Sequence, residues 1–110
     1  MFIWLKPHYP IPRHHHSDDC MYYVISGSLL MGGQTLQGGD ALYIPAGAPY
    51  AYDAGPDGAE VLEIRRGAWR ADIHYLDAER PEVWATMMAT LAAHKGTWET
   101  MEVSPTLAGT

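Results

Sequence analysis

Residues 13–20 read RHHHSDDC, with three consecutive histidines in the middle of the stretch. On a β-strand, residues two apart point to the same face and lie about 6.6 Å apart. His14 and His16 can therefore converge on one ion or ligand, while His15 points away. Imidazole is a good ligand for iron, nickel, copper and zinc. The stretch predicts a metal or small-molecule site on a strand.

The sequence around this stretch alternates short apolar runs with turn residues. The runs are rich in β-branched and aromatic side chains and cover residues 2–5, 21–25, 29–31, 41–44 and 61–64. Glycine, proline and polar residues separate them, at Gly27, Gly32-Gly33, Gly38-Gly39, 45–49 and 53–58. Short strands with regular turn signals predict an all-β sandwich or barrel.

The run 21–25 is apolar on both faces. Alternation places Cys20, Tyr22 and Val24 on one face and Met21, Tyr23 and Ile25 on the other. A strand buried on both sides needs a barrel interior on one side and a second layer on the other. That second layer is either a neighbouring sheet or a second subunit.

A different pattern begins after Asp77. Apolar residues recur at helical spacing over 79–95, with Asp77 as the expected N-cap and Gly96 at the end. We expect one amphipathic helix laid on the barrel and a partly ordered tail after it. The barrel, 1–78, and the helix and tail, 79–110, are expected to form one domain.

The composition of the chain excludes several classes of binding partner. The chain has 110 residues, a formal net charge of -6 and one cysteine. An acidic chain lacks the basic face that nucleic acid or an anionic membrane requires. One cysteine forms no internal disulfide, and no apolar run is long enough to span a membrane. We expect a cytoplasmic protein that forms a homodimer, because a small domain alone buries little of its surface.

The spacing after the histidines resembles the first motif of the cupin family, and the resemblance covers roughly residues 3–66. In the family this motif is HxH, three or four residues, Glu, six residues and Gly. Here it reads His14-x-His16, three residues, Cys20, six residues and Gly27.

The family's second motif follows in the right order. It consists of Gly, five residues, Pro-x-Gly, two residues and His, and here it reads Gly39, five residues, Pro45-x-Gly47, two residues and Tyr50. The resemblance implies a cupin-type antiparallel β-barrel, jelly-roll-like, which the predicted C-terminal α-helix accompanies.

The departures from the family pattern bear on function. The resemblance implies metal ligands at His14, His16, Cys20 and Tyr50, but only the two histidines keep the family's residue type. Thiolate favours zinc, copper or iron, and tyrosinate needs its pKa of about 10 lowered by the metal. Cysteine at this position also occurs in cupin thiol dioxygenases, which keep three histidines. His74 is a candidate for the third by residue type alone.

The same two residues have a simpler interpretation. Cys20 can be a small buried hydrophobe, and Tyr50 can be part of an aromatic wall. Tyr22, Val24 and Tyr52 share the inward face and are expected to line the substrate pocket.

Three acidic residues lie near the predicted site. Asp18 and Asp19 read as turn residues that can also orient ligand histidines. Glu63 lies between apolar Leu62 and Ile64 and is therefore predicted to face solvent. In the opposite register it would enter the barrel as a general base.

Two functions follow from these features. The first is a cupin-type metalloenzyme with one divalent transition metal per chain, Fe(II) favoured and Zn, Ni, Mn or Cu possible, acting as a dioxygenase on an enolisable or phenolic small molecule. The second is a metal-free cupin that binds a small molecule or acts as a cyclase or isomerase. The intact histidine pair favours the first, and the two replaced ligands favour the second.

Overall fold

The computed structural model describes residues 1–65, 73–77, 79–101 and 104. The strands are β1 (Phe2–Leu5), β2 (Pro10–His15), β3 (Cys20–Met31), β4 (Gln34–Gln37), β5 (Ala41–Ile44), β6 (Tyr50–Arg65) and β7 (His74–Tyr75), and the helix is α1 (Pro81–Trp98). The predicted class, an all-β barrel with one C-terminal helix, is confirmed. No helix in the described part of the chain is long and apolar enough to cross a membrane.

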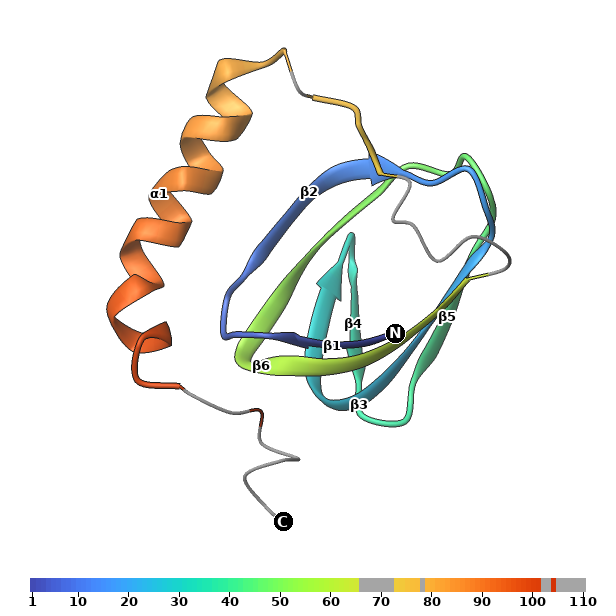
Figure 1. Cartoon of the computed structure of the whole chain (residues 1–110), viewed down its shortest axis with the longest axis horizontal. Coiled ribbons are helices and arrows are strands. Elements are labelled where there is room, and N and C mark those ends of the chain that lie inside the picture. Colours follow the sequence, from blue (N-terminus) through green and yellow to red (C-terminus); the bar gives the residue numbers. More distant parts are fainter. Residues whose placement is uncertain (66–72, 78, 102–103, 105–110) are drawn as a thin grey trace.

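Every strand pair in the sheet is antiparallel. The strands follow the order β4-β3-β6-β2-β7, while β1 pairs with β6 and β5 pairs with β3. The long strands β3 and β6 pair along most of their length, and both bend. Figure 1 shows the result, in which the strands curl into a barrel and α1 lies beside β2.

The bends in β3 and β6 correct the predicted strand boundaries. Turns were predicted at Gly27 and at 53–58, but both segments lie inside continuous strands. Gly27 and Gly58 have φ of 72° and 77°, a left-handed conformation that glycine adopts without strain. A Cβ on Gly27 would also overlap the backbone carbonyl of Gly58. The strands therefore bend here without ending.

β2 carries an irregularity of its own. Ile11 pairs with Tyr52 of β6, yet His14, three residues later, pairs with Tyr50, only two residues away. The extra residue makes a bulge that includes Pro12, which has no N–H to offer the ladder. The bulge directs the His14 side chain into the barrel.

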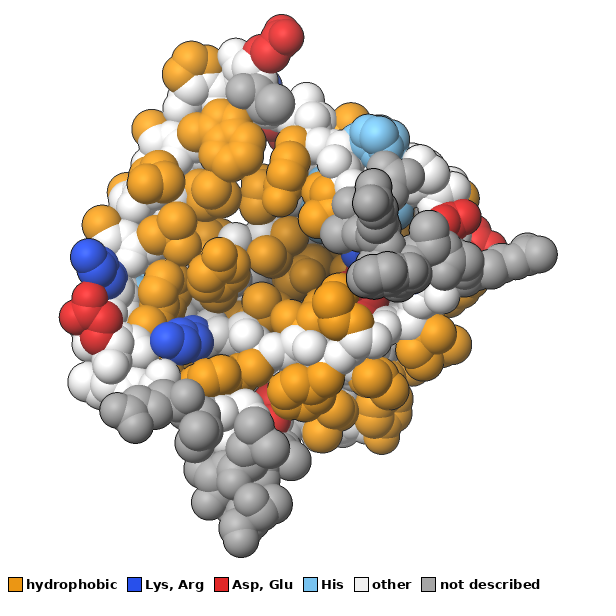
Figure 2. Space-filling view, viewed as in Figure 1, with side chains coloured by type: hydrophobic (Ala, Val, Ile, Leu, Met, Phe, Trp, Pro, Cys, Tyr) orange, Lys and Arg blue, Asp and Glu red, His pale blue; other side chains and the backbone are white. Residues whose placement is uncertain are grey.

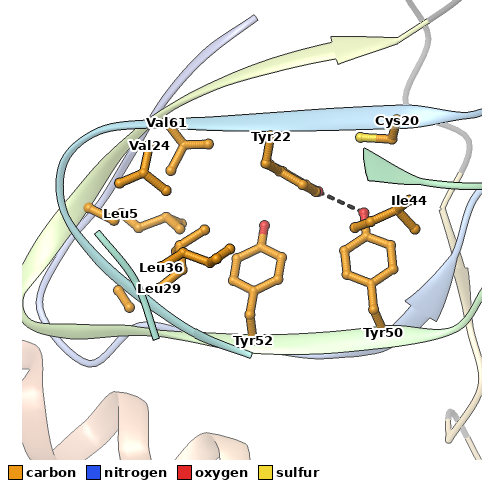
Figure 3. Close-up of a cluster of buried hydrophobic side chains, with 12 residues drawn as sticks. Leu5, Cys20, Tyr22, Val24, Leu29, Leu36, Ile44, Tyr50, Tyr52 and Val61 are labelled. Carbon is orange, nitrogen blue, oxygen red and sulfur yellow. Dashed lines mark hydrogen bonds between the residues drawn. The ribbon is translucent and has the colours of Figure 1, made fainter. Parts of the chain in front are cut away.

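The core has an apolar end and a polar end, and Figure 3 shows both between β3 and β6. The apolar end holds Leu5, Val24, Leu29, Leu36 and Val61. The polar end holds Cys20, Tyr22, Tyr50 and Tyr52. Hydroxyl groups inside a barrel require hydrogen-bond partners, and so the polar end is where a site is expected.

The predicted alternation of β3 is confirmed. Cys20, Tyr22 and Val24 are buried in the barrel. Met21, Tyr23 and Ile25 point outward and are 40%, 42% and 38% exposed. One chain therefore forms the barrel interior by itself. No described residue covers the outer face of β3, which carries Met21, Tyr23 and Ile25.

The helix lies where the sequence pattern predicted it, but it begins and ends at other residues than the predicted 79 and 95. It begins at Pro81 after Arg80 as N-cap, because Asp77 instead forms an ion pair with Arg13. It continues through Gly96 to Trp98, whose Nε1 donates to the Pro7 carbonyl at 2.7 Å. Tertiary contacts of the tryptophan thus outweigh the weak helix propensity of glycine. Apart from Ser104, the predicted tail beyond residue 101 lies outside the described residues.

Candidate functional site

A cavity of about 170 Å³ lies at the polar end of the barrel. Its walls come from every part of the fold except β4, β5 and the helix, and the lining residues are Met1, Ile3, Leu5, Ile11, His14, His16, Tyr22, Tyr52, Glu63, Arg65, Ile73 and Tyr75. Figure 2 shows the molecule hollowed on this face, with hydrophobic side chains around the hollow. Aliphatic walls with a few polar groups are typical of small-molecule sites.

His14 and His16 meet at this cavity, as the strand spacing predicted. Both side chains are buried, and their ring centroids are 4.9 Å apart with the planes nearly perpendicular. His14 Nδ1 lies 2.8 Å from the Pro12 carbonyl and donates to it, which leaves Nε2 with a free lone pair. Burial lowers the pKa of His14 below its usual value. This imidazole is therefore neutral near pH 7.

Glu63 enters the barrel, and the prediction that it faces solvent was wrong. Its side chain is 3% exposed and lies directly across from Tyr22 in the β3–β6 pairing. The neighbours Leu62 and Ile64 point outward instead. Leu62 pairs with Tyr23 and continues the apolar outer face, which turns Glu63 inward, and this pairing is known only from the structure.

Four donors surround one oxygen of the Glu63 carboxylate. Oε1 accepts hydrogen bonds from Arg65 Nε at 2.7 Å, the Tyr22 hydroxyl at 3.2 Å and Cys20 Sγ at 3.3 Å, and also from Arg65 Nη2. A buried carboxylate needs such partners, since an unpaired charge inside a protein is costly.

Arg65 was not identified as a site residue from the sequence. Besides holding Glu63, its Nη2 donates to His16 Nε2 at 3.2 Å. The histidine nitrogen that would face a metal ion thus faces a guanidinium group. Only the three-dimensional pairing of β3 with β6 reveals this, because Arg65 lies far from both motifs in the chain.

Cys20 and Tyr50 belong to the same hydrogen-bonded network. The Tyr50 and Tyr22 hydroxyls are 2.7 Å apart, as the dashed line in Figure 3 shows. Burial, and then the Glu63 charge, raises the pKa of Cys20 to about 11. Burial likewise raises the pKa of Tyr50. Both groups are therefore protonated near neutral pH, as the simpler interpretation of these residues requires.

The predicted pocket wall is brought together in part. Tyr22 and Tyr52 line the cavity, and burial raises the pKa of Tyr52 to about 12, so its hydroxyl also stays protonated. Val24 is fully buried in the apolar end of the core and does not line the cavity. Its substrate-binding role finds no support in this placement.

His74 does not reach the cavity. It pairs with His15 across β2 and β7, and the two rings stack with centroids 4.8 Å apart. Asp19 accepts a hydrogen bond from the Ala46 amide at 2.8 Å, which holds the loop of the second motif, and Asp18 is exposed. These residues shape the rim of the barrel.

The fold family implies a metal, but the side-chain arrangement does not fit one. Among the described residues, no group of three or more His, Cys, Asp or Glu side chains is placed to hold a metal ion. Of the four predicted ligands, His14 alone presents a lone pair to the cavity. His16 faces Arg65, Cys20 donates to Glu63, and Tyr50 is bonded to Tyr22. Metal ligation by these residues stays a prediction.

The sequence matches no protein-family model and no curated protein. The chain is similar to several solved structures, of which three are described below. A DMSP lyase from Ruegeria pomeroyi has a TM-score of 0.62 at 23% identity over 71% of this chain. An RmlC-like cupin from Shewanella frigidimarina has a TM-score of 0.56 at 20% identity over 63% of this chain. A deletion mutant of Bacillus subtilis oxalate decarboxylase has a TM-score of 0.61 at 25% identity over 80% of this chain.

The chain spans 42%, 65% and 27% of the lengths of these three proteins, respectively. What it shares with them is therefore the barrel and not the whole of each protein. The bent antiparallel barrel, the two motifs in order and these structural relatives together show that the chain has a cupin-type fold.

Proposed function

We propose that the chain binds a small molecule in its barrel cavity and transfers a proton on it, with His14 as the base and no bound metal ion. The observation that supports this is the state of His14. Its Nδ1 is tied to the Pro12 carbonyl, its Nε2 lone pair is free, and its lowered pKa keeps it neutral. A neutral imidazole at a cavity wall is a suitable general base.

The volume and the lining of the cavity limit the size and the polarity of the ligand. A cavity near 150 Å³ accommodates benzene, so about 170 Å³ accepts a molecule on the order of six to ten non-hydrogen atoms. Ile3, Ile11 and Ile73 provide apolar walls, and the protonated hydroxyl of Tyr52 is available as a donor. The substrate class is a small, mostly apolar carbonyl compound.

The reaction class is proton transfer next to a carbonyl group. His14 Nε2 takes a proton from the carbon beside the carbonyl, and the electron pair moves onto the carbonyl oxygen as an enolate. The same imidazolium returns the proton to the starting carbon or to another atom of the enolate. No oxidant or further reactant is consumed, which makes this an isomerase-type reaction.

Deuterium exchange tests the proposal directly. Acetophenone is incubated with the protein in D2O with EDTA, and loss of the methyl proton signal is followed by NMR. We expect the protein to accelerate the exchange and His14→Asn to slow it by about 100-fold or more, because a general base contributes that much. Asn retains a donor for the Pro12 carbonyl but lacks Nε2.

His15→Asn is the matched control, since His15 faces the opposite side of β2 and stacks on His74. It should exchange at the parent rate. Equal rates for the parent and His14→Asn would remove His14 as the base.

A second candidate is the mononuclear metal enzyme, with iron as the favoured metal and dioxygenase activity on an enolisable or phenolic substrate. The approach of the His14 and His16 rings favours it. Among the structural relatives, oxalate decarboxylase is described with Mn(II) centres. Elemental analysis of untagged protein, purified without added metal, distinguishes the metal enzyme from the metal-free proposal. About one metal per chain, lost in His14→Ala plus His16→Ala, would replace the metal-free proposal.

A further inference from the structure

We infer that the guanidinium of Arg65, held in place by Glu63, occupies the cation position of this barrel, binds the ligand's carbonyl or carboxylate oxygen and keeps divalent metal ions out. The inference rests on the proposed function in one respect, that the ligand occupies the cavity. It adds the residue that recognises the ligand and the chemical group that is recognised.

The position of Arg65 in the sheet is the first argument. It lies directly across from Cys20 in the β3–β6 pairing, at the point where the family motif carries its carboxylate ligand. Its Nη2 lies 3.2 Å from His16 Nε2. The Arg65 side chain is 15% exposed and lines the cavity. A guanidinium group therefore lies against the motif histidine at the cavity wall.

The Glu63 pairing is the second argument. Two nitrogens of Arg65 donate to one buried carboxylate oxygen, which fixes the guanidinium and neutralises its charge locally. The bond from Arg65 to His16 uses the lone pair of Nε2. A metal ion at that lone pair would need Arg65 to move, and Glu63 would then lose its strongest partner.

The third argument is the unused part of the guanidinium. In the described part of the chain, Arg65 Nη1 has no hydrogen-bond partner, although the Nε and Nη2 groups do. Nη1 carries two N–H donors and no acceptor. A ligand oxygen with free lone pairs satisfies them, and both a ketone and a carboxylate provide one.

The ligand test uses three probes of similar size in EDTA-containing buffer: acetophenone, benzoate and ethylbenzene. Calorimetric titration is expected to show tighter binding of an oxygen-bearing probe than of ethylbenzene. Arg65→Gln should weaken that binding at least about 10-fold and leave ethylbenzene unchanged, since one charge-assisted bond contributes about 1.5–3 kcal/mol. Binding of acetophenone or of benzoate identifies the group as a carbonyl or a carboxylate.

The control for this arm is Arg13→Gln, because Arg13 pairs with Asp77 away from the cavity. Unchanged affinity in Arg65→Gln would overturn the inference and leave the proposed function standing. Failure of all three probes to bind the parent protein would overturn both.

The metal test uses Co²⁺, followed by its visible absorption. We expect weak binding by the parent and at least about 10-fold tighter binding by Arg65→Gln, because the change removes the guanidinium from His16 Nε2 and from the Glu63 carboxylate. Both side chains can then turn toward His14 and form a three-ligand group that the described residues do not form in the parent. Two imidazoles and a carboxylate are a known ligand set for a divalent metal. Adding Glu63→Gln should abolish the gain.

The double variant Glu63→Gln plus Arg65→Gln also guards against a folding defect, since it leaves no unpaired buried charge. It should fold, bind Co²⁺ no better than the parent and bind the oxygen-bearing probes as weakly as Arg65→Gln. Parent protein that binds Co²⁺ as tightly as Arg65→Gln, or a double variant with parental affinity for the probes, would overturn the inference.

Discussion

At Gly27 the backbone has a φ of 72° and runs against the Gly58 carbonyl on β6. Both the conformation and the close approach require a residue without a Cβ. The family motif has glycine at this point, and the structure gives the physical reason, since β3 bends here while it stays paired.

We therefore expect Gly27→Ala to lower the free energy of unfolding by about 2–4 kcal/mol. Urea denaturation followed by circular dichroism measures it. Gly33→Ala is the matched control, because a Cβ there meets nothing within 4 Å, and its stability should change little. A similar small change for Gly27→Ala would show that β3 can adjust its bend.

His14 should link stability to pH. Its pKa is lowered in the folded barrel, so the folded state favours the neutral ring. The unfolded chain takes up this proton near the ordinary value of 6.5. Stability from His14 is therefore fully present above pH 6.5 and falls as the pH drops from 6.5 toward the lower folded pKa.

The measurement is the melting temperature at about pH 7.5 and about pH 5.5, on either side of the ordinary histidine pKa. The loss on acidification should be smaller in His14→Asn than in the parent. His15→Asn should lose as much as the parent does. An identical pH dependence in His14→Asn and the parent would contradict a lowered pKa for His14.

At the scale of elements, the helix is attached mainly through its last residue. Trp98 donates its Nε1 to the Pro7 carbonyl, and its own carbonyl accepts a bond from Lys6 Nζ at 3.0 Å. Its ring also packs against Tyr9, with the centroids 5.4 Å apart. The other helix residues on this side, such as His94 stacked on His8, are only half-buried.

Replacing Trp98 should thus detach the helix. We expect Trp98→Ala to lower the free energy of unfolding by about 3–5 kcal/mol, in the range of large-to-small core changes. Trp98→Phe keeps most of the ring but not the N–H, and should lose only about 1 kcal/mol. Chemical denaturation of both variants checks this. Equal losses in the two would mean that the hydrogen bond, and not the packing, holds the helix.

The elements also show what the sequence could predict. Runs 2–5 and 41–44 coincide with β1 and β5, because each is a short apolar strand bounded by real turns. Gly27 and 53–58 carry turn residues too, yet they mark bends, since glycine signals a conformation and not the end of a strand. Local pattern alone cannot separate the two outcomes.

The site was predictable to a similar extent. Alternation placed His14 and His16 together and turned Tyr22 inward, because those residues share one strand or one face. Glu63 and Arg65 come from β6, far along the chain from the two histidines, and their roles depend on the β3–β6 register, which no local spacing encodes. The sequence showed that Cys20 replaces the carboxylate ligand of the family motif. It did not show that the Arg65–Glu63 ion pair lies on the strand opposite Cys20.

At the scale of the whole molecule, the outer sheet face suggests a partner. Exposed apolar side chains continue across four paired strands, namely Phe2, Met21, Tyr23, Tyr43, Leu62 and Ile64. None of them carries a charge, although the chain has a net charge of -6. An uncharged apolar face can meet its own copy without like-charge repulsion, and we propose that it forms a homodimer.

Light scattering at micromolar concentration tests the dimer. The parent should have twice the mass of one chain, and Tyr23→Glu should be monomeric, because two carboxylates would be buried at the centre of the face. Met88→Glu, on an exposed part of the helix, should stay dimeric. A monomeric parent would leave this face to a different partner.

The bulge at Pro12 has a consequence for how the base is prepared. Many enzymes set the protonation pattern of a catalytic histidine with a carboxylate side chain. Here a main-chain carbonyl does it, and a carbonyl cannot gain or lose a proton. The choice of tautomer is thereby independent of acidity and of ligand charge, and it changes only when the strand itself is realigned.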